Sequence, residues 1–275
     1  MESTTGLASH ARSRASTAAQ PASMLISPPA DGATNMALDE ALLQRAGRTG
    51  TTIYRVYEWS RPTVSLGRNQ AARGWYDLGL AESRGIEFVR RPTGGRAILH
   101  HREITYAVAG PVSGFGSLGE SYRRINRLLL EALRTLGVDA HEATAAGRAP
   151  SPGVAPCFES PVAGELVAGG RKLVGSAQVR DGDAFLQHGS ILVENDQHLL
   201  NELLHDRETS PPPATLRTLT GRAVTTDEFA NALAQAVRTQ GGMAPTPLDP
   251  DQGLLTDVQS LIRTRYAVAD WTWRR

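Results

Sequence analysis

The chain has 275 residues, with 29 basic and 28 acidic side chains and a formal net charge of +1. This balance argues against a dedicated nucleic-acid-binding protein, which would carry a clear basic excess. A hydrophobic content of 40% suffices for a core, no apolar run is long enough to cross a membrane, and the single cysteine excludes an internal disulfide. We therefore expect a cytoplasmic protein that binds neither nucleic acid nor membrane.

Residues 1–23 are rich in Ser, Ala, Thr and Arg and contain almost no large apolar side chains. Such a segment buries too little surface to order itself, so we expect a disordered N-terminal tail. It lacks the apolar stretch of a secretory signal, and its likeness to an organelle transit peptide is loose. A flexible tail, or a translation start at Met24, is the favoured interpretation. Residues 24–275 are then predicted to form a single domain.

The first half of this domain is predicted to contain two helices and several strands. Residues 35–43 have the amphipathic pattern of a helix that Thr34 or Asn35 caps. The side chains predicted to face inward from it are Leu38, Ala41 and Leu42. Residues 121–136 form the clearest helical stripe, which ends at Gly137. Strand patterns occupy 52–57, 63–66, 86–90 and 103–108.

The second half begins with an Ala-, Gly- and Pro-rich loop over 141–156. A three-stranded meander is predicted next, because Gly-Gly and Asp-Gly pairs suit tight hairpin turns; its strands span 165–168, 172–179 and 184–193. A Pro-rich linker at 211–213 precedes a helix from the capping box at Thr225 to Gln240, and residues 254–266 are a last helix. Strands and helices without a regular alternation indicate an α+β fold, a mixed or antiparallel sheet flanked by helices.

Three segments carry candidate chemistry. In the first, residues 90–101, Gly94 and Gly95 follow a strand and let the backbone approach a ligand closely. An ordinary hairpin turn is the alternative. Three arginines, Arg90, Arg91 and Arg96, would repel one another around this turn, which favours an anionic or polar ligand there.

The second and third segments should lie side by side as hairpin partners. Lys172 opens one strand and shares a face with Val174 and Ser176. A lysine against an apolar sheet face is costly without a partner or a function, although a solvated strand end is the commoner case. His188 lies in the other strand, where a structural histidine is the alternative to a catalytic one.

Cys157, the one thiol, lies between two prolines and is either inert and buried or a nucleophile. No His or Cys spacing predicts a metal site. There is also no P-loop and no GxGxxG after a strand.

In this order, the three segments resemble the biotin/lipoate protein ligase superfamily, from Met24 onwards. Lipoate–protein ligases carry a related Arg-Arg-x-Ser-Gly-Gly-Gly segment, for which this chain has Arg90-Arg91-Pro92-Thr93-Gly94-Gly95-Arg96. Cys157, fifteen positions before Lys172, and the Gln187-His188-Gly189-Ser190 segment are further departures from the ligases. The chain is most similar to the cysteine-dependent octanoyl-[acyl carrier protein]:protein N-octanoyltransferases.

This resemblance implies transfer of an octanoyl group from acyl carrier protein to a lysine of a lipoyl domain, in the glycine cleavage H protein or a 2-oxoacid dehydrogenase E2. Cys157 would form an acyl-enzyme and Lys172 would be its catalytic partner. No cofactor is needed, because the incoming thioester is already activated. The implied substrate-binding residues are Arg91, Thr93, Gly94, Gly95, Arg96, Ala97, His100, Gly175, Ser176, Ala177, Gln187, His188 and Gly189.

The role of each residue stays open. A nearby cation lowers the pKa of a thiol, so Lys172 would favour the Cys157 thiolate, or it would manage the proton of the acceptor lysine. Backbone N–H groups near Ala97 or Ser176 are candidates for an oxyanion hole. The arginines expected to meet the acidic carrier are Arg68, Arg73, Arg90 and Arg91.

Three other functions compete. The nearest is an ATP-dependent lipoate–protein ligase, which would use ATP and magnesium and leave Cys157 a bystander. A lipoyl amidotransferase would move lipoyl groups between lysines through the same cysteine. The non-catalytic alternative is an acyl-binding module.

Overall fold

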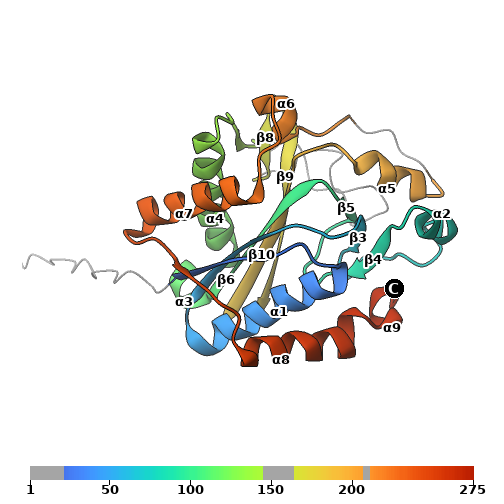
Figure 1. The fold of residues 1–275 in the computed structure, drawn as a ribbon, viewed down its shortest axis with the longest axis horizontal. Helices are drawn as coiled ribbons and strands as arrows, with labels where there is room; N and C mark the ends of the chain where they lie inside the picture. The colour runs from blue at the N-terminus through green and yellow to red at the C-terminus, as the bar shows by residue number, and fades with distance from the viewer. Residues whose placement is uncertain (1–21, 145–163, 207–210) are drawn as a thin grey trace, which may run out of the picture.

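A computed structural model describes residues 22–144, 164–206 and 211–275 (Figure 1). Within these residues, a mixed eight-stranded sheet has the order β11-β1-β2-β6-β10-β9-β8-β7. Its strands, in chain order, are β1 (Ala22–Ile26), β2 (Thr52–Tyr57), β6 (Glu103–Pro111), β7 (His141–Glu142), β8 (Leu166–Ala168), β9 (Arg171–Asp181), β10 (Ala184–Leu192) and β11 (Thr246–Pro247). The long antiparallel strands β6, β10 and β9 form its centre and carry most of the candidate site residues.

Helices cover both faces of this sheet, in the arrangement that Figure 1 shows. One face packs against α1 (Gly32–Thr49), which in turn packs against α8 (Gln252–Leu261) and the π-helical turn η1 (Ile262–Tyr266). The other face packs against α4 (Leu118–Thr135) and α7 (Thr226–Gly241). Short helices complete this part: α3 (Val112–Phe115) and α6 (Leu216–Thr220).

A smaller sheet stands beside the large one and carries the Arg- and Gly-rich turn. Its order is β4-β3-β5, with β3 (Thr63–Leu66) parallel to β4 (Glu87–Arg90) and antiparallel to β5 (Ile98–His100). Residues 91–97 connect β4 to β5. A separate apolar cluster supports this sheet, with α2 (Leu78–Ser83) and α5 (Gln197–Leu203) against it, and α9 (Ala269–Thr272) lies next to β4.

The predicted α+β class is confirmed, and so is the meander, since β8, β9 and β10 pair in sequence. Two details were wrong. The cap of α1 is Asp31, whose side chain accepts from the Thr34 N–H, because the helix begins earlier than its apolar pattern. The predicted inward face of this helix is confirmed, since Ala41 and Leu42 are buried and Leu38 packs partly buried against the same cluster, but Asp39 and Glu40 are buried as well. The strand β1 starts at Ala22, inside the segment predicted as a tail. No helix in the described ranges is long and apolar enough to cross a membrane.

A buried ion pair joins α1 to the central sheet. Arg55 on β2 donates from Nη1 to Asp39 Oδ1 at 2.6 Å and from Nη2 to Asn35 Oδ1 at 2.7 Å. The Tyr57 hydroxyl donates to the other Asp39 oxygen at 2.9 Å. The side chains of Arg55 and Asp39 are both 0% exposed, so each charge depends on the other for compensation.

We expect Arg55→Met to lower the free energy of unfolding by about 3–5 kcal/mol, because it leaves the Asp39 carboxylate buried without its counter-charge. The matched control is Arg45→Met, which removes the exposed ion pair with Asp251 and should cost about 0–1 kcal/mol. Urea unfolding of the three proteins measures both values. Equal losses in the two variants would contradict the importance of the buried pair.

Candidate active site

A cavity lies where the central sheet, α1 and the smaller sheet meet; the space between its lining atoms is about 440 Å³ when the open solvent at its entrance is included. The predicted site residues that line it are Arg91, Gly95, His100, Gly175, Ser176, Ala177, His188 and Gly189. Sheet register explains why segments far apart in sequence meet here, because His188 pairs with Ala177 on one side and Ala107 on the other. The glycine and alanine positions keep this part of the wall free of large side chains.

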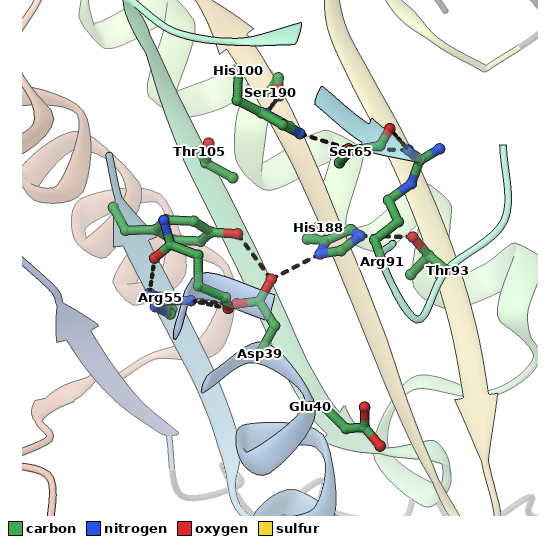
Figure 2. Close-up of polar contacts among 12 residues, drawn as sticks. Asp39, Glu40, Arg55, Ser65, Arg91, Thr93, His100, Thr105, His188 and Ser190 are labelled. Atoms are coloured by element: carbon green, nitrogen blue, oxygen red, sulfur yellow. Dashed lines mark hydrogen bonds and ion pairs between the residues drawn. The ribbon is translucent and has the colours of Figure 1, made fainter. Parts of the chain in front are cut away.

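His188 stands at the centre of a buried hydrogen-bonded chain (Figure 2). Its Nδ1 lies 2.8 Å from Asp39 Oδ2, and its Nε2 lies 2.7 Å from the Thr93 hydroxyl. A carboxylate only accepts, so Nδ1 carries the proton and Nε2 must accept from the Thr93 hydroxyl. These hydrogen bonds therefore connect α1, β10 and the turn after β4.

The ionisable groups of this hydrogen-bonded chain, Asp39 and His188, are each held in one protonation state. Burial by itself would raise the pKa of Asp39, but the Arg55 charge and the hydrogen bonds from His188 and Arg55 outweigh it and lower that pKa. Burial lowers the pKa of His188 and outweighs the opposing effect of Asp39. An anionic Asp39 and a neutral His188 are the result.

His100 forms a second wall of the cavity with Trp59, whose ring is stacked on it at a centroid distance of 4.0 Å. The imidazole is fixed by Glu103 at Nδ1 and by the Ser65 hydroxyl at Nε2, each at 2.7 Å. The Trp59 indole N–H donates to the Thr105 hydroxyl at 2.8 Å. Both rings are therefore locked in place.

Two arginines of the turn segment, Arg90 and Arg91, have buried side chains. Arg91 is 5% exposed and donates to the Gly94, Arg96 and Ser65 carbonyls. Arg90 is fully buried and donates to carbonyls of the 67–70 loop and to Thr272 O. The expectation that Arg90 and Arg91 meet a carrier protein at the surface is thus wrong, since both side chains are used inside the fold.

Lys172 is buried, and its Nζ lies 2.6 Å from Glu165 Oε1. It precedes the cavity-lining Gly175 by three positions on β9, roughly 10 Å along a strand. The structure thus gives this lysine the acidic partner that its buried position demands. Cys157 lies outside the described residues, so its pairing with Lys172 stays a prediction.

The remaining predicted residues of the described ranges do not line the cavity. Thr93 and Ala97 are buried, and Gly94 and Arg96 lie in the turn between them. Gln187 faces the opposite side of the sheet, where its Nε2 donates to the Tyr106 hydroxyl at 2.8 Å. In the described ranges, no group of three or more His, Cys, Asp or Glu side chains is arranged to hold a metal ion.

Sequence reasoning missed the residues that position this site: Asp39, Arg55, Tyr57, Trp59, Ser65, Glu103 and Thr105. One signal was available, because Asp39 lies one turn from Asn35 and Met36 in a helix whose packed face was predicted from its apolar residues alone. An acid on the packed face of a helix requires a buried partner.

The neutral buried His188 should make folding sensitive to acid. Its lowered pKa means that, below pH of about 6.5, the unfolded chain binds a proton that the folded chain does not. Stability should fall by up to about 1.4 kcal/mol per pH unit in this window, whereas the Asp39 contribution is lost only at lower pH. Denaturant unfolding at pH 7.5 and 5.5 should show that His188→Gln loses less of its free energy of unfolding at the lower pH than the wild-type protein does. The exposed His198→Gln is the control, and an equal loss in both variants would count against this assignment.

Comparison with known proteins gives concordant matches. The model of the lipoyl protein ligase A/B catalytic domain matches residues 31–238. Octanoyltransferase LipM of Kyrpidia tusciae is 38% identical over 263 residues, which cover 88% of this chain and 95% of the relative. Octanoyltransferase LipM of Carboxydothermus hydrogenoformans is 46% identical over 177 residues, a match that spans 63% of this chain and 65% of the relative.

Solved structures agree on the fold. A putative lipoate protein ligase from T. acidophilum superposes with a TM-score of 0.77 at 22% identity, covering 93% of this chain and all of the other. A lipoate-protein ligase A bound with ATP gives the same TM-score and identity and covers 92% of this chain. The domain match and the near full-length relatives show that this chain belongs to the lipoyl protein ligase A/B catalytic-domain family.

Proposed function

We propose that this chain transfers an octanoyl group from a carrier-bound thioester to a lysine of a lipoyl domain, through an acyl-enzyme on Cys157, in lipoate biosynthesis. The enzyme class has the firmest support: the chain is an octanoyltransferase, as its relatives at 35% to 46% identity are named. The single observation that carries the cysteine mechanism is the buried Lys172–Glu165 pair on the strand that lines the cavity.

Two displacements at one carbonyl carbon complete the reaction. The Cys157 thiolate attacks the octanoyl thioester, a new carbon–sulfur bond forms, and the thiolate of the donor leaves. The acceptor amine then attacks, a carbon–nitrogen bond forms, the Cys157 thiolate leaves, and the amine loses a proton. Both steps start from a thioester, so neither requires ATP.

Lys172 supports this chemistry in one of two ways. Its ammonium favours the Cys157 thiolate by charge, or it exchanges the proton that the acceptor amine releases. Glu165, at 2.6 Å from Nζ, fixes the position of the ammonium in either case. The cavity beside it, with its small residues and the Trp59–His100 wall, suits a linear acyl chain, whose burial stabilises by about 0.8 kcal/mol per CH₂.

Incubation with octanoyl carrier protein, without ATP, should add one octanoyl group to the protein, as intact mass spectrometry measures. Cys157→Ser should abolish the adduct, and Lys172→Met should slow its formation about 100-fold or more. Acceptor modification that requires ATP and free lipoate would identify a ligase instead. An acyl group accepted only from another acylated protein would identify an amidotransferase, and saturable acyl binding with no transfer would identify a binding module.

A ridge of exposed arginines, formed by Arg68, Arg73 and Arg275, is the surface we assign to the acidic donor. Arg68, Arg73 and Arg275 are exposed, and none forms an ion pair within the ranges that the structure describes. The ridge is continuous, since the Ala72 and Arg73 N–H groups donate to Arg275 O at 3.0 and 3.3 Å. It adjoins the turn, since the Arg68 N–H donates to Thr93 O at 2.8 Å.

Replacing Arg68 and Arg73 by Gln should raise the KM for octanoyl carrier protein about 10-fold at low salt and flatten its salt dependence, because charge steering is lost. The rate with S-octanoyl pantetheine, which lacks the carrier, should not change. Arg84→Gln is the control, because Arg84 is neutralised by Glu202. An equal fall in rate with octanoyl carrier protein and with S-octanoyl pantetheine would contradict a docking role.

The acceptor and the compartment complete the proposal. The acceptor is the lysine of a lipoyl domain, in a glycine cleavage H protein or a 2-oxoacid dehydrogenase E2. The reaction takes place in the cytoplasm, where a reducing environment keeps the single thiol available.

A further inference from the structure

The backbone turn after β4 has its carbonyl groups bound on one side. Arg91 Nη2 lies 2.8 Å from both Gly94 O and Arg96 O. The carbonyl between them, Gly95 O, packs against Gly67 so closely that a Cβ on Gly67 would lie 1.8 Å from it. Three successive carbonyls are therefore held on the side of Arg91 and β3.

The N–H groups of this turn must point the other way, because the C=O and N–H of a trans peptide are antiparallel. The Gly95 and Ala97 N–H groups donate to no acceptor among the described residues. Gly95 lines the cavity, and Ala97 is 1% exposed. An unsatisfied buried donor such as the Ala97 N–H costs about 1–3 kcal/mol, whereas Gly95 is exposed where it lines the cavity; the two N–H groups together indicate the place of a ligand oxygen.

The turn is also fixed at its start and by its own backbone. The Thr93 hydroxyl is held by His188, whose other nitrogen is held by Asp39. Gly95 has φ of +96°, and a Cβ there would lie 2.7 Å from Arg91 Nη2, so only glycine fits between the turn and the guanidinium. The geometry exists before any substrate binds, as electrostatic stabilisation of a transition state requires.

We propose that the Gly95 and Ala97 N–H groups bind the carbonyl oxygen of the acyl thioester, and that Arg91 is the positioning residue that aims them. This inference rests on the proposed octanoyl transfer. When the thiolate adds to the carbonyl carbon, the electron pair of the C=O bond moves onto this oxygen, which the two N–H groups stabilise. When the leaving thiolate departs, the pair returns and the C=O bond re-forms.

Exchange of the carbonyl oxygen for sulfur tests the proposal, since sulfur is a weak hydrogen-bond acceptor. We would compare S-octanoyl pantetheine with its dithioester analogue in single-turnover acylation of the full chain. The wild-type protein should strongly prefer the oxygen compound. Arg91→Lys, which cannot hold the Gly94, Arg96 and Ser65 carbonyls together, should lose about 100-fold in kcat for the oxygen compound at unchanged KM, and little for the sulfur compound.

Arg61→Lys is the matched control, because Arg61 is exposed just before β3 and pairs with Glu87. Should Arg91→Lys fail to fold, Thr93→Val against Thr93→Ser provides the second comparison, and only the valine variant should lose the oxygen preference. Equal rates of the two compounds with the wild-type protein, or an unchanged preference in Arg91→Lys and Thr93→Val, would overturn the inference alone. Absence of any octanoyl adduct on the wild-type protein would overturn the proposed function with it.

Discussion

The carboxylate of Asp39 is the point on which the geometry of the site depends. It accepts hydrogen bonds from Arg55 and Tyr57 on β2 and from His188 on β10, and it belongs to α1. A charge with no exposed surface is stable only when such partners are all in place, so the helix has little freedom to slide on the sheet. The same charge fixes the tautomer of His188 and, through it, the orientation of the Thr93 hydroxyl.

This constraint reaches the cavity through the smaller sheet. The turn from Thr93 to Ala97 connects two strands of that sheet. It is held by His188 of the central sheet, through Thr93, and by Arg91, through the Gly94 carbonyl. Two separately packed sheets thus line one cavity, and buried side chains at their junction restrict the flexibility that a glycine-rich turn would otherwise have. Rigidity of this kind preserves the spacing between a carbonyl and its donors through the reaction cycle.

Local patterns predicted the elements well and their partners poorly. The hairpin signals at Gly169-Gly170 and Asp181-Gly182 fixed the meander, because tight turns are encoded within a few residues. The packed face of α1 was predicted without Asp39, because this acid looks like a surface residue until Arg55 is placed opposite it. The Glu165 partner of Lys172 was missed for the same reason. Burial of a charge is a property of two segments together, and one sequence does not reveal the pairing.

The end of the chain closes this arrangement. Tyr266 donates to the buried Glu40 of α1, and the Trp271 indole donates to Arg90 O at 2.8 Å. These contacts join positions separated by 226 and 181 residues. Contacts so distant in sequence form late and slow the search for the native state. During synthesis on the ribosome, the base of the Arg91 turn therefore lacks this support until residues 266–271 have emerged.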